Sequence, residues 1–163
     1  MIEVVVAQLG LDRNTNSPVV ILREKDGTRV LPIWIGPAEA SAIAMEMQGI
    51  HPSRPMTHDL LKSVIVGLDA TVRRIVISGL KEKTYFAEIW LARGESAIQI
   101  DARPSDSIAL ALRVSAAIYT EDRLLEESGD EESAPRPDPS LDAQTLKAHL
   151  ERMNPEDFGK FQP

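Results

Sequence analysis

The chain has 163 residues, no cysteine and a formal net charge of −7, and 43% of its residues are hydrophobic. This length and composition suit one domain with its own hydrophobic core. The absence of cysteine excludes disulfides, thiol nucleophiles and cysteine-ligated zinc or iron–sulfur centres. Residues 1–120 carry equal numbers of acidic and basic side chains, so the negative excess lies in residues 121–163. The body therefore neither indicates a large nucleic-acid footprint nor excludes a local basic groove.

The N-terminal part of the chain is typical of a three-stranded meander followed by a helix. Runs of β-branched and apolar residues predict strands at residues 2–9, 18–25 and 29–35. The Asp26-Gly27 pair predicts a tight hairpin turn before the third strand, because it supplies the positive φ that such a turn needs. Pro37 suits a first helical position and Gly49 suits a helix stop, which together predict a helix over residues 38–48.

The middle of the chain alternates helical and strand-like patterns. Apolar spacing predicts a helix that Thr57 caps and that runs to Leu68. A second helix, capped by Ser105, is expected over residues 106–114, and it is apolar almost all round, which predicts burial between layers or at a subunit contact. The other predicted elements are strands at residues 72–78, 84–92, 96–102 and 118–120 and a partial helix at 121–127.

Three segments divide the chain by composition. Residues 1–127 are expected to form the folded domain, and residues 128–140 form an acidic, proline-rich linker. Residues 141–163 contain a short amphipathic pattern, which predicts a C-terminal helix. Strand-like sequence starts at the N-terminus without a basic leader, and no apolar run is long enough to span a membrane, so we expect a cytoplasmic protein.

The turn from the strand at 96–102 into the next helix concentrates charged and polar groups: Asp101, Arg103, Ser105 and Asp106. Two carboxylates there suit Mg²⁺ or Mn²⁺, and an arginine beside a helix N-terminus suits a phosphate. Composition and spacing alone favour a structural explanation, in which Arg103 pairs with Asp101 and Asp106 complements the helix dipole.

His58 and Asp59 form the second candidate, as an imidazole next to a carboxylate at the start of a helix. Adjacent helical positions diverge by about 100°, so the two side chains do not share one face and a relay between them is not expected. Asp59 also suits a dipole-complementing role, and His58 a capping or surface role.

Four segments in unbroken order carry a resemblance to the bifunctional nuclease domain family of bacteria and plants. They are Leu31-Pro-Ile-Trp-Ile-Gly-Pro-Ala-Glu-Ala, Arg54-Pro-Met-Thr-His-Asp-Leu, Tyr85-Phe-Ala and Asp101-Ala-Arg-Pro-Ser-Asp-Ser-Ile-Ala-Leu-Ala-Leu-Arg. The resemblance implies an α/β fold of the α+β type, with a mixed, largely antiparallel sheet and helices packed against it. It also implies a wedge-shaped homodimer with a groove, and DNase and RNase activity. The family motifs fall on Glu39, Arg54, Thr57, His58, Asp59, Asp101, Arg103, Ser105 and Asp106.

Together with these residues, the resemblance leads to the hypothesis of a non-specific nuclease for DNA and RNA, preferring single strands, that needs a divalent metal. In this hypothesis Asp101 and Asp106 hold the metal and His58 assists proton transfer. Arg54 and Arg103 neutralise the phosphate. Asp59 is a further catalytic candidate and Ser105 a further substrate-binding candidate.

The alternative is a non-catalytic dimeric module that binds nucleic acid, a nucleotide or a protein, in which the same residues only hold the strand-to-helix turns in shape. The acidic C-terminal segment is expected to screen the groove or to contact a protein partner.

Overall fold

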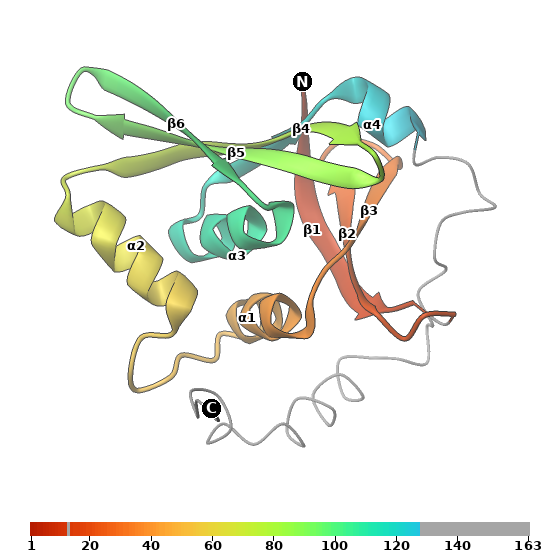
Figure 1. Ribbon diagram of the computed structural model, residues 1–163, viewed down its shortest axis with the longest axis horizontal. Coiled ribbons are helices and arrows are strands. Elements are labelled where there is room, and N and C mark those ends of the chain that lie inside the picture. The colour runs from red at the N-terminus through yellow and green to blue at the C-terminus, as the bar shows by residue number, and fades with distance from the viewer. Residues whose placement is uncertain (13, 128–163) are drawn as a thin grey trace.

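The computed structural model describes residues 1–12 and 14–127. A seven-stranded sheet forms one layer, and helices α1, α2 and α3 cover one of its faces (Figure 1). The strand order is β3-β2-β1-β7-β4-β5-β6, and every neighbouring pair is antiparallel except β4 with β7. The predicted α+β class, with a largely antiparallel sheet, is therefore confirmed.

The elements follow the predicted patterns closely. The strands are β1 Ile2–Leu11, β2 Pro18–Glu24, β3 Val30–Trp34, β4 Thr71–Lys81, β5 Thr84–Arg93, β6 Ser96–Ala102 and β7 Ala117–Thr120. The helices are α1 Pro37–Met47, α2 Thr57–Gly67, α3 Pro104–Val114 and α4 Asp122–Glu127. The predicted meander is β1 to β3. The predicted linker at 128–140 and helix at 141–163 lie outside the described residues.

The helix starts differ from the predicted caps. Met56 and not Thr57 is the N-cap of α2, and its backbone N–H donates to the Asp59 carboxylate at 2.9 Å. Arg103 and not Ser105 is the N-cap of α3, because Pro104 takes the first helical position, where a missing N–H costs nothing. The N-caps of α2 and α3 therefore lie one and two residues before the predicted Thr57 and Ser105.

Helix α3 is the centre of the helical layer, as its apolar sequence predicts. It packs against β4 and β5 on one side and against α1 and α2 on the others. Ile108, Ala109 and Leu110 are completely buried. The alanines allow this close approach between helix and sheet. Because α3 is fixed on all sides, the polar groups at its N-terminus have defined positions.

The end of α1 shows why Gly49 ends the helix. Its φ is +67°, and the backbone N–H groups of Gly49 and Ile50 donate back to Glu46 and Met45 at 3.1 and 2.9 Å. This pair of hydrogen bonds is a Schellman motif, which needs a left-handed residue at this place. The turn directs the chain into the loop toward α2. Within the described part of the chain, none of the helices has the length and apolar character needed to cross a membrane.

Candidate active site

The first turns of three helices meet on the helical side of the sheet, and each contributes an acidic residue. These are Glu39 in α1, Asp59 in α2 and Asp106 in α3. Carboxylates are favoured there because the unpaired N–H groups of a helix N-terminus carry a partial positive charge. The local sequence preference of each helix therefore places one acidic group at each of these helix starts.

Hydrogen bonds link two of these carboxylates with an arginine and a histidine into one network. The Arg103 guanidinium donates from Nε to Asp106 Oδ2 at 2.7 Å and from Nη2 to Glu39 Oε1 at 2.7 Å. The other oxygen of the Asp106 carboxylate, Oδ1, lies 3.0 Å from His58 Nε2. Asp106 thus holds an imidazole on one oxygen and a guanidinium on the other. We call Glu39, His58, Arg103 and Asp106 the His–Asp–Arg network.

The carboxylate of Asp106 is ionised in this setting. Burial raises its pKa and is the largest single influence, but the hydrogen bonds and charges of Arg103 and His58 together outweigh it and hold the pKa below the ordinary value of 3.8. The hydrogen bond to Asp106 in turn raises the pKa of Arg103, as does the charge of Glu39. The network therefore keeps a fixed anion between two basic groups.

His58 is largely enclosed, with 11% of its side-chain surface exposed. Its Nε2 is bound to Asp106, whereas Nδ1 has no hydrogen-bond partner within the described residues. Among those residues, the buried side-chain atoms without a partner are Arg74 Nε and Ser107 Oγ, so His58 Nδ1 is not buried. One nitrogen of the ring is thus held by an anion, and the other has no hydrogen-bond partner among the described residues.

Asp59 belongs to a different interaction. Its Oδ1 accepts from Arg113 Nε at 2.6 Å, and Arg113 also donates to the backbone oxygens of Ala109 and Ala42 at 2.9 and 3.2 Å. Burial raises the pKa of Asp59, but Arg113 and the Met56 N–H outweigh it, so the pKa lies below 3.8. The pair ties α2 to α3 and α1, and it gives Asp59 a structural role at the turn that carries His58.

The predicted divergence of His58 and Asp59 is therefore confirmed, since they contact opposite ends of α3. The sequence interpretation missed the partners themselves: it did not pair His58 with Asp106 and did not name Arg113. One signal for Arg113 was available. An arginine in a helix that is otherwise apolar all round is seldom buried without an ionic partner.

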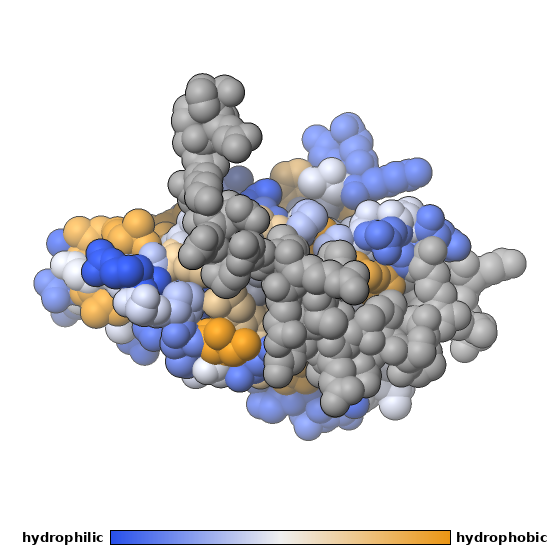
Figure 2. Space-filling model, turned by 90° about the horizontal axis from the view of Figure 1, so that it is seen from below, coloured by the Kyte–Doolittle hydropathy of each residue, from blue (hydrophilic) through white to orange (hydrophobic). Residues whose placement is uncertain are grey.

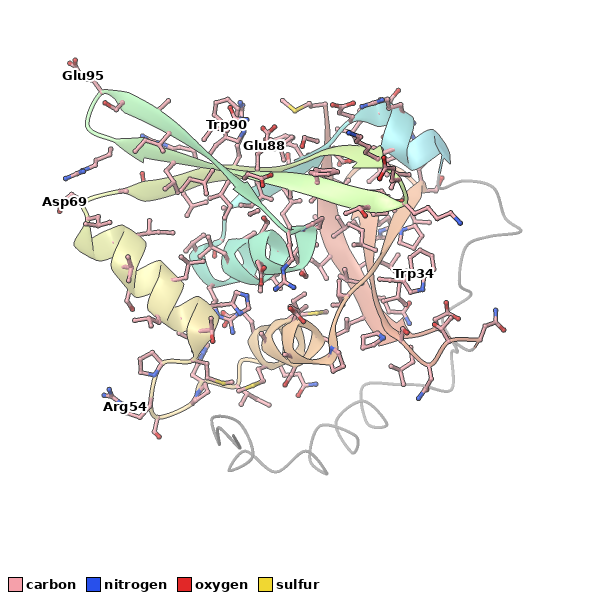
Figure 3. The ribbon with its side chains drawn as sticks, in the orientation of Figure 1. Trp34, Arg54, Asp69, Glu88, Trp90 and Glu95 are labelled. Atoms are coloured by element: carbon pink, nitrogen blue, oxygen red, sulfur yellow. The ribbon has the colours of Figure 1, made fainter. Side chains whose placement is uncertain are left out.

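Asp101 does not join the network. It lies directly opposite Glu88 in the β5–β6 ladder, and residues opposite each other in a sheet share a face. The Trp90 indole N–H donates to Glu88, and both side chains project from the side of the sheet away from the helices (Figure 3). Asp101 and Asp106 are therefore on opposite sides of the sheet. Nor does Arg103 pair with Asp101, as the structural alternative proposed; it binds Asp106 and Glu39.

The remaining predicted residues are scattered. Arg54 is exposed in the loop between α1 and α2 and points outward from the molecule (Figure 3); it forms no hydrogen bond or ion pair with another described residue. Ser105 is buried as the second residue of α3. Among the described residues, neither side chain is hydrogen-bonded to the His–Asp–Arg network.

The described residues do not fit the predicted divalent metal. They contain no group of three or more His, Asp or Glu side chains arranged to hold an ion. Both oxygens of Asp106 are already bonded to basic groups, and Asp101 lies on the other face of the sheet. Mg²⁺ and Mn²⁺ prefer several oxygen ligands, commonly with one or two free carboxylates. The described residues therefore do not form a site for the predicted metal.

Comparison with known proteins gives consistent matches. A family model described as the bifunctional nuclease domain matches residues 20–133, which include the whole His–Asp–Arg network. An uncharacterized protein of Mycobacterium tuberculosis strain H37Rv is 41% identical over 165 residues, covering 96% of this chain and 97% of that protein. Bifunctional nuclease 1 of Arabidopsis thaliana is 27% identical over 100 residues, covering 59% of this chain and 31% of that protein. Bifunctional nuclease 1 of Oryza sativa subsp. indica is 25% identical over 125 residues, covering 74% and 38%.

Proposed function

Because the chain belongs to the bifunctional nuclease domain family, we propose that it is a nuclease that cleaves phosphodiester bonds of DNA and RNA, preferring single strands. Similarity to plant proteins named bifunctional nucleases supports the reaction class. The observation that carries the proposal is the single Asp106 carboxylate that holds an imidazole and an exposed guanidinium side by side. A base next to a phosphate-binding cation is the minimum equipment for phosphodiester cleavage.

Each member of the network has a role in this proposal. Asp106 orients His58 and stabilises the imidazolium that forms when the ring takes a proton, as a carboxylate behind a histidine does in other hydrolytic sites. Arg103 has 67% of its side chain exposed and neutralises the phosphate. Glu39 holds the guanidinium in place from α1. Single strands are preferred because a flexible strand bends toward a site set between helix ends.

The test compares two matched pairs of variants. Asp106→Asn keeps the shape of the side chain and removes its charge, and Asp69→Asn makes the same change at an exposed position at the far end of α2 (Figure 3). His58→Ala is paired with His51→Ala, which lies in the exposed loop before α2. Cleavage of labelled single-stranded DNA and RNA is measured, with circular dichroism melts as the fold control.

We expect Asp106→Asn and His58→Ala to lower cleavage by about 100-fold or more, which is the usual range for loss of acid–base catalysis. Both controls should stay within twofold of the parent protein. Equal cleavage in all four variants, with intact folds, would contradict the proposal.

A second candidate function is a non-catalytic nucleic-acid-binding module. It is favoured by the saturation of Asp106, whose two oxygens are both used in contacts that join α3 to α2 and to the N-cap of α3. In that case Asp106→Asn lowers the melting temperature and weakens binding, and any cleavage in the preparation does not follow the variant.

We place the contact of the proposed homodimer on the apolar surface of α2 and β6. Leu60, Val64 and Leu68 recur every four residues along α2 and are exposed, and so are Ile98 and Ile100 of β6. Figure 2 shows hydrophobic side chains at the end of the molecule where α2 lies. The order of the sheet ends at β6, so this strand offers a free edge to a second copy.

The dimer is tested by light scattering after size-exclusion chromatography. Leu60→Glu combined with Val64→Glu should give a monomer, because two charges would be buried at the contact. Thr84→Glu, an exposed residue of the β4–β5 hairpin, serves as the control and should leave the mass unchanged. A parent protein that is monomeric at micromolar concentration would contradict the dimer.

The acidic C-terminal segment is proposed to screen the groove from nucleic acid or to contact a protein partner, since its charge repels phosphates. Removal of residues 128–163 should raise the affinity for single-stranded DNA at low salt. Unchanged affinity would contradict the screening role.

A further inference from the structure

We propose that the His–Asp–Arg network cleaves RNA by using the ribose 2′-hydroxyl as the nucleophile, without a metal ion, and leaves a 2′,3′-cyclic phosphate. The inference rests on the proposed function and names its favoured substrate and its chemistry. Three observations lead to it: the tautomer that Asp106 imposes on His58, the position of Arg103 beside that ring, and the lack, among the described residues, of a group of three acidic or histidine side chains that could hold a metal.

The Asp106 carboxylate decides which nitrogen of His58 acts. An ionised carboxylate only accepts hydrogen bonds, so Nε2, which lies 3.0 Å from Oδ1, carries the ring proton. Nδ1 of the neutral ring then has the free lone pair. Because Nδ1 has no partner among the described residues and is not among their buried unpaired atoms, it is the nitrogen left to take a proton from a substrate.

Arg103 lies within reach of the same phosphodiester. Its Nε and the His58 Nε2 bind the two oxygens of one carboxylate, so the guanidinium and the imidazole are neighbours. Arg103 uses Nε for Asp106 and Nη2 for Glu39, and most of its side chain is exposed. A phosphate bound to this guanidinium places the adjacent 2′-hydroxyl next to the imidazole.

The reaction needs no other group of the protein, because water supplies and accepts the remaining protons. Nδ1 of His58 takes the proton of the 2′-hydroxyl, the 2′-oxygen forms a bond to phosphorus, and the bond from phosphorus to the 5′-oxygen breaks. The leaving 5′-oxygen takes a proton from water, and the imidazolium, stabilised by Asp106, returns its proton to water. The products are a 2′,3′-cyclic phosphate on one fragment and a 5′-hydroxyl on the other.

DNA offers no such internal nucleophile. Its cleavage requires a water molecule, which is commonly activated by a bound metal, and the described residues provide no group of three ligands for one. An attached nucleophile in the right geometry has an effective molarity of about 10⁵ M or more. The network as built therefore favours RNA strongly over DNA.

The experiment alters the substrate and leaves the protein unchanged, so its result does not depend on whether a variant folds. The probe is a labelled DNA oligonucleotide that contains a single ribonucleotide. It is compared with the same oligonucleotide carrying 2′-deoxy or 2′-O-methyl at that position, each with EDTA and with Mg²⁺. Products are identified by mass. The full chain is used, with His58→Ala and its control His51→Ala as a second measurement.

We expect one cut after the ribonucleotide, a mass matching the cyclic phosphate, and a rate that changes less than twofold with EDTA. The 2′-deoxy and 2′-O-methyl probes should be cut at least about 1,000-fold more slowly. His58→Ala should lose the cut and His51→Ala should keep it.

Two other outcomes separate a failure of this inference from a failure of the proposed function. Cleavage that needs Mg²⁺, or that proceeds equally on the 2′-O-methyl probe, overturns this inference and leaves the nuclease assignment intact. Failure to cut any of the probes, or full-length RNA and single-stranded DNA, with or without Mg²⁺, overturns the proposed function and the inference with it.

Discussion

Replacing Arg113 by methionine tests whether the three helices depend on one buried ion pair. Only 5% of the Arg113 side chain is exposed, and its guanidinium binds Asp59 as well as backbone oxygens of α1 and α3. Methionine fills much of the same volume but leaves the Asp59 carboxylate without its partner. Removing one partner of a buried pair costs about 3–5 kcal/mol.

The structure places the expected loss near the lower end of that range. Asp59 keeps 27% of its side-chain surface exposed, so water partly solvates the unpaired carboxylate. The Met56 N–H also continues to donate to it. We therefore expect a loss of about 3 kcal/mol in the free energy of unfolding. For a domain of this size, that corresponds to a melting temperature lower by roughly 10 °C.

The assay is urea unfolding followed by circular dichroism, where the midpoint should fall and the slope m should stay the same. Arg93→Met, at an exposed strand end, is the matched control and should change stability by less than about 0.5 kcal/mol. Adding Asp59→Asn to Arg113→Met should recover part of the loss, because the unpaired charge is gone. An Arg113→Met protein within about 1 kcal/mol of the parent would refute the reasoning.

Three further predictions follow from the same contacts. The pKa values of Asp59 and Asp106 lie below 3.8 in the folded protein, so the stability that the two carboxylates contribute is complete well above pH 3.8 and is lost as the pH falls through the lowered values. The urea midpoint should therefore drop steeply below about pH 4. An Asp106→Asn protein that is as sensitive to acid as the parent would contradict this. Gly49→Ala should cost about 1 kcal/mol because φ is +67°, whereas Gly67→Ala, at an open helical position, should add about 0.4–1 kcal/mol; thermal melts that rank them the other way would count against the backbone argument. Arg103→Lys keeps the charge but not the fork that spans two carboxylates, so KM for RNA should rise about tenfold; an unchanged KM would remove Arg103 from substrate binding.

Much of the fold was accessible from local patterns. The meander, the hairpin of β4 and β5, and the buried character of α3 all follow from periodicities that a short window of residues contains. Gly49 and Pro37 mark the ends of α1 for reasons that involve only their own backbone. Such features depend on residues close in the sequence, so no knowledge of the packing is needed to predict them.

For the candidate site, the sequence predicted a set of residues but not the contacts between them. The motifs named His58, Arg103 and Asp106, which the structure joins by hydrogen bonds, but the hypothesis joined Asp106 to Asp101. Those two are five residues apart, yet the alternation of β6 turns Asp101 to the face of Glu88, while Asp106 lies in the helical layer. Spacing in the sequence does not report the side of a sheet on which a side chain lies.

The sequence alone determined the elements and the family, and the bounds of the elements to within a few residues, because each depends on local backbone preferences or on short motifs. Only the tertiary structure decided which charges meet. His58 reaches Asp106 across 48 positions, Arg103 reaches Glu39 across 64, and Arg113 reaches Asp59 across 54. These residues, far apart in the sequence, meet because the burial of α3 between α1, α2 and the sheet fixes three helix N-termini side by side. The hydrophobic effect that drives this burial carries no information about which polar groups it brings together.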